Sequence, residues 1–188
     1  REVVAVINNA ARYVAHTGRK ISRWSHFWRP KKVVYDLPWY MMLGPKDSGK
    51  TTAVLSSGQE FPLPEQLLRV SRESTPTVNC ECWFTNEAIF VDTSGKYIDE
   101  SDENAGEWEA LVKAIKKNRP LKSLNGVVVT IPVTDLMGKD KKELYALSSK
   151  FRTQLDMLRH ELGVRFPVYV MITKMDMVSG FDEYFRSL

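Results

Sequence analysis

The sequence has 188 residues, of which 43% are apolar and 27% are charged, with a net charge of +4. This balance is typical of a globular domain and excludes a disordered or collagen-like chain. The longest apolar run, residues 126–133, is far shorter than the ~20 residues that cross a bilayer, so we expect no membrane span and no signal peptide. The chain starts at Arg1 and not at a methionine, which favours an excised fragment.

Residues 1–36 form a basic arm with eight basic and two acidic side chains, a net charge of +6 that leaves −2 for the rest. Apolar or small residues recur at helical steps up to Trp28, with an interruption near Thr17 and Gly18. This predicts an amphipathic helix that ends before Pro30. Three roles fit: packing on its own domain or a partner, a juxtamembrane stalk with its basic residues on the cytoplasmic side, or nucleic-acid binding. No other basic cluster supports the third, so we expect no nucleic acid.

From residue 37 to residue 188 apolar strands alternate with helical segments, and we treat this stretch as the second domain. Strands are predicted at residues 39–43, 80–85, 88–91, 126–131 and 167–172, and helices at 51–57, 107–118, 141–162 and from 181 onward. Asn86 and Glu87 form a tight-turn pair, which predicts a hairpin. The continuous apolar strands predict an α/β fold with a mostly parallel, buried sheet and helices on both faces.

Cys80 and Cys82 lie two residues apart in a predicted strand and therefore point to the same face. Two cysteines make no disulfide framework, and the three histidines are too scattered to complete a metal site. We expect two reduced, half-buried thiols and a reducing compartment.

Residues 44–51, GPKDSGKT, match the phosphate-binding pattern G-x-x-x-x-G-K-[ST], with a predicted strand before it and a helix after it. The glycines let backbone N–H groups wrap phosphates, and the helix N-terminus adds positive potential. We expect Lys50 to act as a catalytic residue on the β- and γ-phosphates and Thr51 to bind Mg²⁺. A glycine turn without a ligand is the alternative. The other predicted phosphate-binding residues are Gly44, Asp47, Ser48, Gly49 and Thr52.

Residues 89–95 read Ile-Phe-Val-Asp-Thr-Ser-Gly, an apolar strand that ends in an aspartate. In this arrangement Asp92 holds Mg²⁺ through water, and the amide of Gly95 contacts a γ-phosphate and senses its hydrolysis. Lys96 stands where small GTPases usually carry the glutamine that orients the attacking water, and we place it with Lys50 as a catalytic residue. Without that glutamine we expect slow turnover.

The sequence leaves two residues of a working GTPase site unassigned between alternatives. The threonine that covers Mg²⁺ in GTPases is either Thr75 or Thr77, because both lie between the first helix and the hairpin. Arg72 and Arg119 are the candidates for an arginine that stabilises the transition state.

Residues 173–176, Thr-Lys-Met-Asp, follow a predicted buried strand and resemble the [NT]-K-x-D motif that recognises guanine. The carboxylate of Asp176 can accept hydrogen bonds from guanine, and the stem of Lys174 can cover the ring. Thr173 replaces the commoner asparagine, so GTP and ATP both remain candidate ligands with Mg²⁺. Only twelve residues follow Asp176, so we expect the domain to be truncated before its last strand, with an incomplete base pocket.

These three motifs together resemble the P-loop GTPase fold. Further segments resemble the TssM/IcmF family: LPWYMMLGP from Leu37, SGQEFPL from Ser57, CWFTNEA from Cys82, DTSGKY from Asp92, NGV from Asn125 and FPVYV from Phe166. The resemblance implies the cytoplasmic P-loop domain of an inner-membrane component of the type VI secretion system, with membrane helices flanking it. It also implies partners among TssL/DotU-like, TssJ-like and baseplate subunits. The IcmF protein of the type IVB Dot/Icm system is the related alternative.

Three functions follow for this domain: a nucleotide-binding switch and slow NTPase, a structural scaffold that keeps the fold without hydrolysis, and an independent regulatory GTPase. Intact Lys50, Thr51, Asp92 and Asp176 favour the first function over the second. Lys96 is the main argument for the scaffold. The basic arm and the family motifs argue against the third function.

Overall fold

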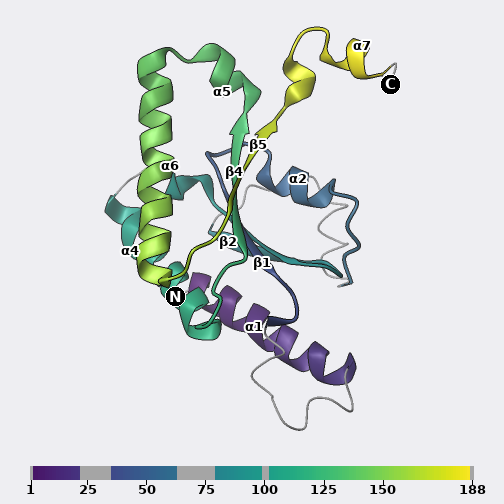
Figure 1. Ribbon diagram of the computed structural model, residues 1–188, viewed down its shortest axis with the longest axis vertical. Coiled ribbons are helices and arrows are strands. Elements are labelled where there is room, and N and C mark those ends of the chain that lie inside the picture. The colour runs from purple at the N-terminus through teal and green to yellow at the C-terminus, as the bar shows by residue number, and fades with distance from the viewer. Residues whose placement is uncertain (1, 22–34, 63–78, 99–101, 187–188) are drawn as a thin grey trace.

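A computed structural model describes residues 2–21, 35–62, 79–98 and 102–186 (Figure 1). The strands in these ranges are β1 (Trp39–Leu43), β2 (Cys80–Phe84), β3 (Ile89–Thr93), β4 (Gly126–Pro132) and β5 (Val168–Thr173). The helices are α1 (Glu2–Ile21), α2 (Lys50–Leu55), α4 (Asp102–Asn118), α5 (Val133–Gly138), α6 (Lys141–Leu162) and α7 (Phe181–Phe185), with single 3₁₀ turns η3 (Gly95–Tyr97) and η4 (Met175–Met177).

The strands form one sheet in the order β2-β3-β1-β4-β5. Strand β2 runs antiparallel to β3, and the other neighbouring pairs are parallel. The predicted α/β fold with a mostly parallel sheet is therefore confirmed, as is the hairpin. The order reverses at β1, which has β3 on one side and β4 on the other. Ligands of such sheets bind at the carboxyl ends of the strands at this switch point.

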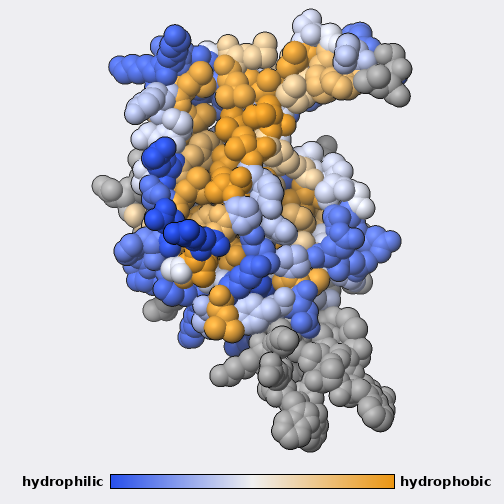
Figure 2. All heavy atoms as spheres, in the orientation of Figure 1, coloured by the Kyte–Doolittle hydropathy of each residue, from blue (hydrophilic) through white to orange (hydrophobic). Residues whose placement is uncertain are grey.

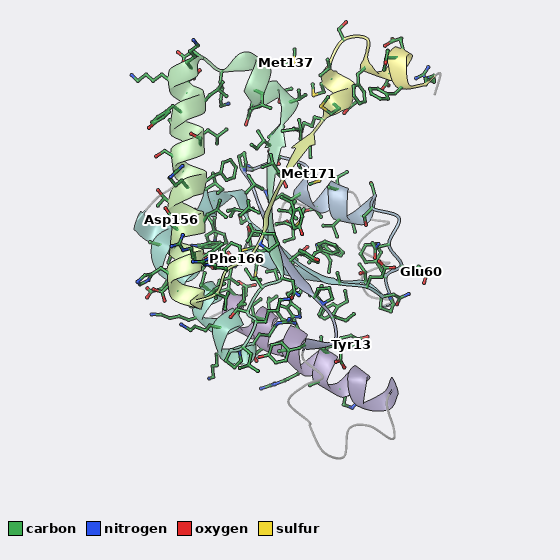
Figure 3. The ribbon with its side chains drawn as sticks, viewed as in Figure 1. Tyr13, Glu60, Met137, Asp156, Phe166 and Met171 are labelled. Carbon is green, nitrogen blue, oxygen red and sulfur yellow. The ribbon has the colours of Figure 1, made fainter. Side chains whose placement is uncertain are left out.

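Helices cover both faces of the sheet (Figure 1). Met41 of β1 belongs to the main core with α1, α4 and α6, whereas Met42 packs against Val54 of α2 in a smaller cluster. Alternate residues of a strand point to opposite faces, so one apolar strand supplies both cores. Figure 3 shows Met171 of β5 on the side of α2, where it packs against the smaller cluster.

The N-terminal helix α1 is part of this core. Its residues Val3, Ile7 and Val14 are at most 4% exposed, and the ring of Tyr13 meets that of Phe84 edge to face at 4.9 Å (Figure 3). Of the three roles considered for the arm, packing on its own domain describes this helix. The interruption predicted near Thr17 and Gly18 was wrong, because α1 continues to Ile21. Trp24 and Trp28 lie outside the described residues, and the juxtamembrane position stays a prediction.

Strand β5 is the main departure from the predicted pattern. It was expected to be buried, but Val168, Tyr169, Val170 and Ile172 are 39–64% exposed. The reason is its place at the edge of the sheet, where β4 is its one neighbour among the described strands. Figure 2 shows apolar side chains gathered on this side of the molecule around β4 and β5.

Helix α6 was predicted accurately at both ends, whereas other helices differ from the sequence pattern, including α4, which starts at Asp102 and not at residue 107. Helix α6 has the predicted bounds, because Asp140 and Glu143 form a capping box at its start and Gly163 closes it at φ 66°. Helix α2 ends two residues early, and α5 was not predicted. In the part of the chain described here, no helix combines the length and the apolar character needed to cross a bilayer.

Candidate functional site

The loop between β1 and α2 has the backbone of a phosphate-binding loop. Gly44 is packed so tightly that a Cβ there would lie 2.6 Å from the carbonyl oxygen of Thr130, which only glycine avoids. Asp47 (φ 57°) and Gly49 (φ 82°) both adopt the left-handed conformation. Such residues turn successive N–H groups toward a common concavity that binds anions. We call residues 44–51 the P-loop.

Lys50 is the first residue of α2 and is 6% exposed. Its Nζ donates to the carbonyl oxygens of Gly44 (2.9 Å) and Pro45 (2.8 Å) and contacts Ser48 Oγ at 3.2 Å. A buried ammonium group needs such partners to offset the loss of water. The lysine therefore holds its charge inside the curve of the P-loop, where phosphates are expected.

Thr51 and Asp92 meet beside this lysine. The Thr51 hydroxyl donates to Asp92 Oδ2 at 2.5 Å, and the Asp92 side chain is fully buried at the end of β3. The next residue, Thr93, donates from its hydroxyl to the carbonyl oxygen of Met42 at 2.7 Å, which fixes the ends of β3 and β1 to each other.

A hydroxyl and a carboxylate at this position fit Mg²⁺, which takes hard oxygen ligands and uses one or two carboxylates together with phosphates and water. Among the described residues, no group of three or more His, Cys, Asp or Glu side chains could hold a metal ion. A magnesium ion held by Thr51 and Asp92 would therefore need phosphate and water oxygens as its remaining ligands.

Gly95 lies directly on the P-loop. A Cβ built on it would come within 2.1 Å of the Lys46 nitrogen and 2.6 Å of the Pro45 carbonyl carbon. The predicted sensor glycine and the predicted phosphate loop are thus in backbone contact. Lys46 and Asp47 are exposed on this loop, and Thr52 is exposed in the first turn of α2.

The ammonium group of Lys96, a predicted catalytic residue, is bound by side chains outside the P-loop. Its Nζ pairs with Glu107 Oε2 of α4 and donates to Asn79 Oδ1, both at 2.5 Å. It also lies 5.2 Å from the centre of the Tyr97 ring. These contacts do not bring Lys96 together with Lys50, and a catalytic role for it stays a prediction.

The end of β5 touches the P-loop through Thr173, the last residue of the strand. Its hydroxyl donates to the Ser48 carbonyl oxygen at 2.6 Å, and a Cβ on Gly49 would meet its side chain at 3.6 Å. Thr173 was predicted from its motif as a base-binding residue. Its hydroxyl stabilises the backbone of the P-loop, a contact that the sequence did not predict. Lys174 follows at φ 56°, and Asp176 is exposed in η4. The predicted phosphate and base segments are therefore neighbours.

Arg119, considered above as a transition-state arginine, lies at the start of β1, away from the P-loop. It is fully buried after α4 and donates to the carbonyl oxygen of Leu37 (3.0 Å) and to Asn125 Oδ1 (3.2 Å), close to the ring of Trp39 at the start of β1. The P-loop follows the other end of that strand. Burial lowers the pKa of the Arg119 guanidinium to about 10. Arg119 therefore fastens the amino end of the sheet and contacts no phosphate-site residue through these bonds.

Three remaining candidates, Arg72, Thr75 and Thr77, lie outside the described residues.

The two cysteines lie as predicted on one face, where Cys80 is buried and Cys82 packs against the main core. Burial raises the pKa of both thiols, that of Cys80 to about 12.

Two comparisons with known proteins point to the same family. Residues 101–188 match the family described as the IcmF-related N-terminal domain. The type VI secretion system component TssM1 of Pseudomonas aeruginosa is 38% identical over 162 residues, which are 84% of this chain. The chain belongs to the TssM/IcmF family.

This TssM/IcmF-family domain spans 15% of the length of TssM1. Two solved structures resemble it at low scores. Bacterial selenocysteine-specific elongation factor EF-Sec has a TM-score of 0.33 and 11% identity, over 81% of this chain and 28% of its own. The GDP complex of an ADP-ribosylation factor-like SAR1 GTPase from Encephalitozoon cuniculi has a TM-score of 0.28 and 12% identity, over 98% and 95%. The fold assignment rests on the strand order and not on these scores.

Proposed function

We propose that this TssM/IcmF-family domain is the Mg²⁺-dependent nucleotide-binding module, for GTP or ATP, of a TssM-like component of a type VI secretion system. Two observations carry the proposal: the Lys50 ammonium group is held by the P-loop carbonyl oxygens, and the next residue, Thr51, pairs with Asp92. A lysine inside an anion-binding loop next to a hydroxyl–carboxylate pair is the arrangement that phosphoryl transfer requires.

Each residue has a defined task in this proposal. The P-loop N–H groups and the Lys50 ammonium group hold the phosphates and stabilise the negative charge that grows on them. Thr51 and Asp92 hold Mg²⁺, which when bound neutralises charge on the phosphate oxygens. Water attacks the γ-phosphorus while the bond to the β–γ bridging oxygen breaks. Turnover is slow, because Lys96 is paired with Glu107 and Arg119 is buried at the other end of the sheet.

The proposal also covers the nucleotide base that the module prefers and its location in the cell. Asp176 is exposed in η4, three residues after the Thr173 that contacts the P-loop, and would give a carboxylate for guanine, so we expect GTP to be preferred over ATP. The similarity to TssM1 supports a place on the cytoplasmic face of a bacterial inner membrane, with TssL/DotU-like, TssJ-like and baseplate subunits as partners. The IcmF component of a type IVB system is the related alternative.

A scaffold that does not hydrolyse nucleotide is the second candidate function. The observation that favours it is the engagement of Lys96, the predicted second catalytic residue, with Glu107 and Asn79. In that case the domain would bind nucleotide weakly, and its helix faces would make the contacts within the secretion complex.

Titration with fluorescent GTP and ATP in the presence of Mg²⁺ tests the proposal, with phosphate release followed in parallel. Lys50→Ala removes the ammonium group from the P-loop, and Lys113→Ala is the matched control because Lys113 pairs with Glu109 on an exposed part of α4. We expect the first substitution to abolish binding and the second to leave it unchanged. Equal weak binding by all three proteins with no phosphate released would refute the switch and leave the scaffold.

A further inference from the structure

Lys96 belongs to a group of polar side chains that we call the Lys96 cluster: Lys96, Glu107, Asn79 and Glu2. Lys96 Nζ contacts Glu107 Oε2 and Asn79 Oδ1, each at 2.5 Å. Asn79 Nδ2 in turn donates to Glu2 Oε2 of α1 at 2.9 Å. The Lys96 and Glu107 side chains are only 28% and 26% exposed. The cluster therefore joins η3 to α4, to the residue before β2 and to α1.

The backbone around Lys96 is fastened to the same elements. The Ser94 amide donates to the Asn79 carbonyl oxygen at 2.8 Å, so Asn79 holds this segment through both its backbone and its side chain. The Tyr97 ring packs against Trp108 of α4 at 5.2 Å between centroids, and both residues are 2% exposed. The position of η3 is thus set by α4 and by the start of β2.

The residue before Lys96 is Gly95, which lies against the P-loop with no room for a Cβ beside the Lys46 nitrogen. Since Gly95 and Lys96 are consecutive, whatever holds Lys96 also restrains Gly95 over this part of the loop. The Lys46 amide is one of the loop N–H groups expected to face phosphate. A phosphate that reaches this amide competes with Gly95 for the same place.

We propose that Glu107 and Asn79 are positioning residues that act through Lys96 to hold Gly95 against Lys46, so that the domain discriminates between nucleoside diphosphates and triphosphates. This inference rests on the proposed function, because it concerns the phosphate site of that function. A diphosphate leaves the contact between Gly95 and Lys46 in place, whereas the third phosphate displaces Gly95 and strains the Lys96 cluster. The cluster therefore lowers the affinity for triphosphate relative to diphosphate.

The test compares Glu107→Gln with Glu109→Gln. Both remove one carboxylate from α4, but Glu109 pairs with Lys113 and lies outside the cluster. Equilibrium titrations with GDP and with GppNHp, a GTP analogue with a non-hydrolysable β–γ imido bridge, both with Mg²⁺, give the affinity ratio for each protein. We expect Glu107→Gln to shift this ratio toward triphosphate by about fivefold or more, a coupling of the usual size between two sites, and Glu109→Gln to leave it unchanged.

Lys96 variants separate this role from a catalytic one. Lys96→Met breaks the cluster and is expected to shift the ratio as Glu107→Gln does, while Lys96→Arg keeps a cation that can pair with Glu107 and restores the wild-type ratio. A lower rate of phosphate release in Lys96→Met with an unchanged affinity ratio would overturn the inference and make Lys96 catalytic.

Amide hydrogen exchange in the nucleotide-free protein supplies a readout that does not depend on binding. We expect residues 94–98 to exchange faster in Glu107→Gln than in Glu109→Gln or the wild type. Equal exchange rates in all three proteins would show that the Lys96 cluster does not restrain Gly95 and would overturn the inference. If the wild type binds neither nucleotide, the proposed function fails and the discrimination fails with it, whereas the exchange result still decides whether Glu107 holds the segment.

Discussion

The hydroxyl of Thr51 donates to the carboxylate of Asp92 at 2.5 Å, across 41 positions of sequence. This contact joins the first turn of α2 to the end of β3, at the point where the strand order reverses around β1. The carboxyl ends of parallel strands at such a point form the ligand site of the fold. The location of the proposed phosphate site therefore agrees with the topology of the sheet as well as with the motifs.

Gly95→Ala is predicted to force the segment after β3 away from the P-loop. The new methyl group would lie 2.1 Å from the Lys46 nitrogen, a distance that the backbone must relieve. We expect a loss of about 1–3 kcal/mol in the free energy of unfolding, the usual range for overpacking, which chemical denaturation measures. Gly106→Ala is the control, since among the described residues no atom beyond its chain neighbours and its own helix backbone lies within 4 Å of its Cβ, and alanine favours the helix there. Equal stabilities of the two variants would contradict the contact.

Arg119→Met is predicted to destabilise the domain without a direct effect on hydrolysis. The change leaves the carbonyl oxygens of Leu37 and Lys122 without their buried donor, which costs about 2–4 kcal/mol of unfolding free energy. The exposed Arg152→Met on α6 serves as the control in thermal unfolding. If Arg119→Met lost phosphate release while keeping wild-type stability, the arginine would act in catalysis and the assignment to the sheet would be wrong.

The buried thiol of Cys80 predicts a loss of stability at alkaline pH. Desolvation raises its pKa from 9.0 to about 12, with Glu107 and Asp92 adding to the effect. Because the folded-state pKa lies above the unfolded value, this contribution is complete below pH 9 and disappears as the pH rises toward 12. Relative to Cys80→Ala, we expect the wild-type unfolding free energy to fall by roughly 1.4 kcal/mol for each pH unit in this window. Urea titrations at several pH values check this, and parallel pH curves for the two proteins would contradict it.

Thr173→Val is predicted to loosen the P-loop while keeping the shape of the side chain. It removes the hydroxyl that donates to the Ser48 carbonyl oxygen at 2.6 Å. Losing a hydrogen bond of about 1 kcal/mol corresponds to an approximately fivefold weaker affinity for nucleotide. Thr173→Ser keeps the hydroxyl and should restore binding. An unchanged nucleotide affinity in Thr173→Val, measured by the same titration, would show that the hydrogen bond from Thr173 to Ser48 does not support the proposed phosphate site.

Much of this fold was predictable because its signals are local. The strand before Gly44 and the helix from Lys141 to Leu162 have apolar patterns and caps that depend on neighbouring residues alone. The meeting of Lys50, Thr51 and Asp92 was predictable for a similar reason, since a parallel sheet brings the ends of β1 and β3 together.

The features that escaped prediction depend on distant contacts. Val170 is as apolar as a buried strand residue, but only the order of the strands shows that it lies at an edge. The partners of Lys96 come from α4 and from the start of β2, and Arg119 reaches back 82 positions to Leu37. Nothing in the local sequence distinguishes these two cations from those of a catalytic site.

The most direct test of the account is the Mg²⁺ dependence of nucleotide affinity in the wild type and in Asp92→Asn. If Asp92 and Thr51 hold the ion, Mg²⁺ strengthens binding to the wild type by about tenfold or more, a difference of about 1.4 kcal/mol. Asp92→Asn then binds equally with Mg²⁺ and with EDTA. A wild type that is insensitive to Mg²⁺, or an Asp92→Asn variant that keeps the full enhancement, would contradict the magnesium-linked nucleotide site.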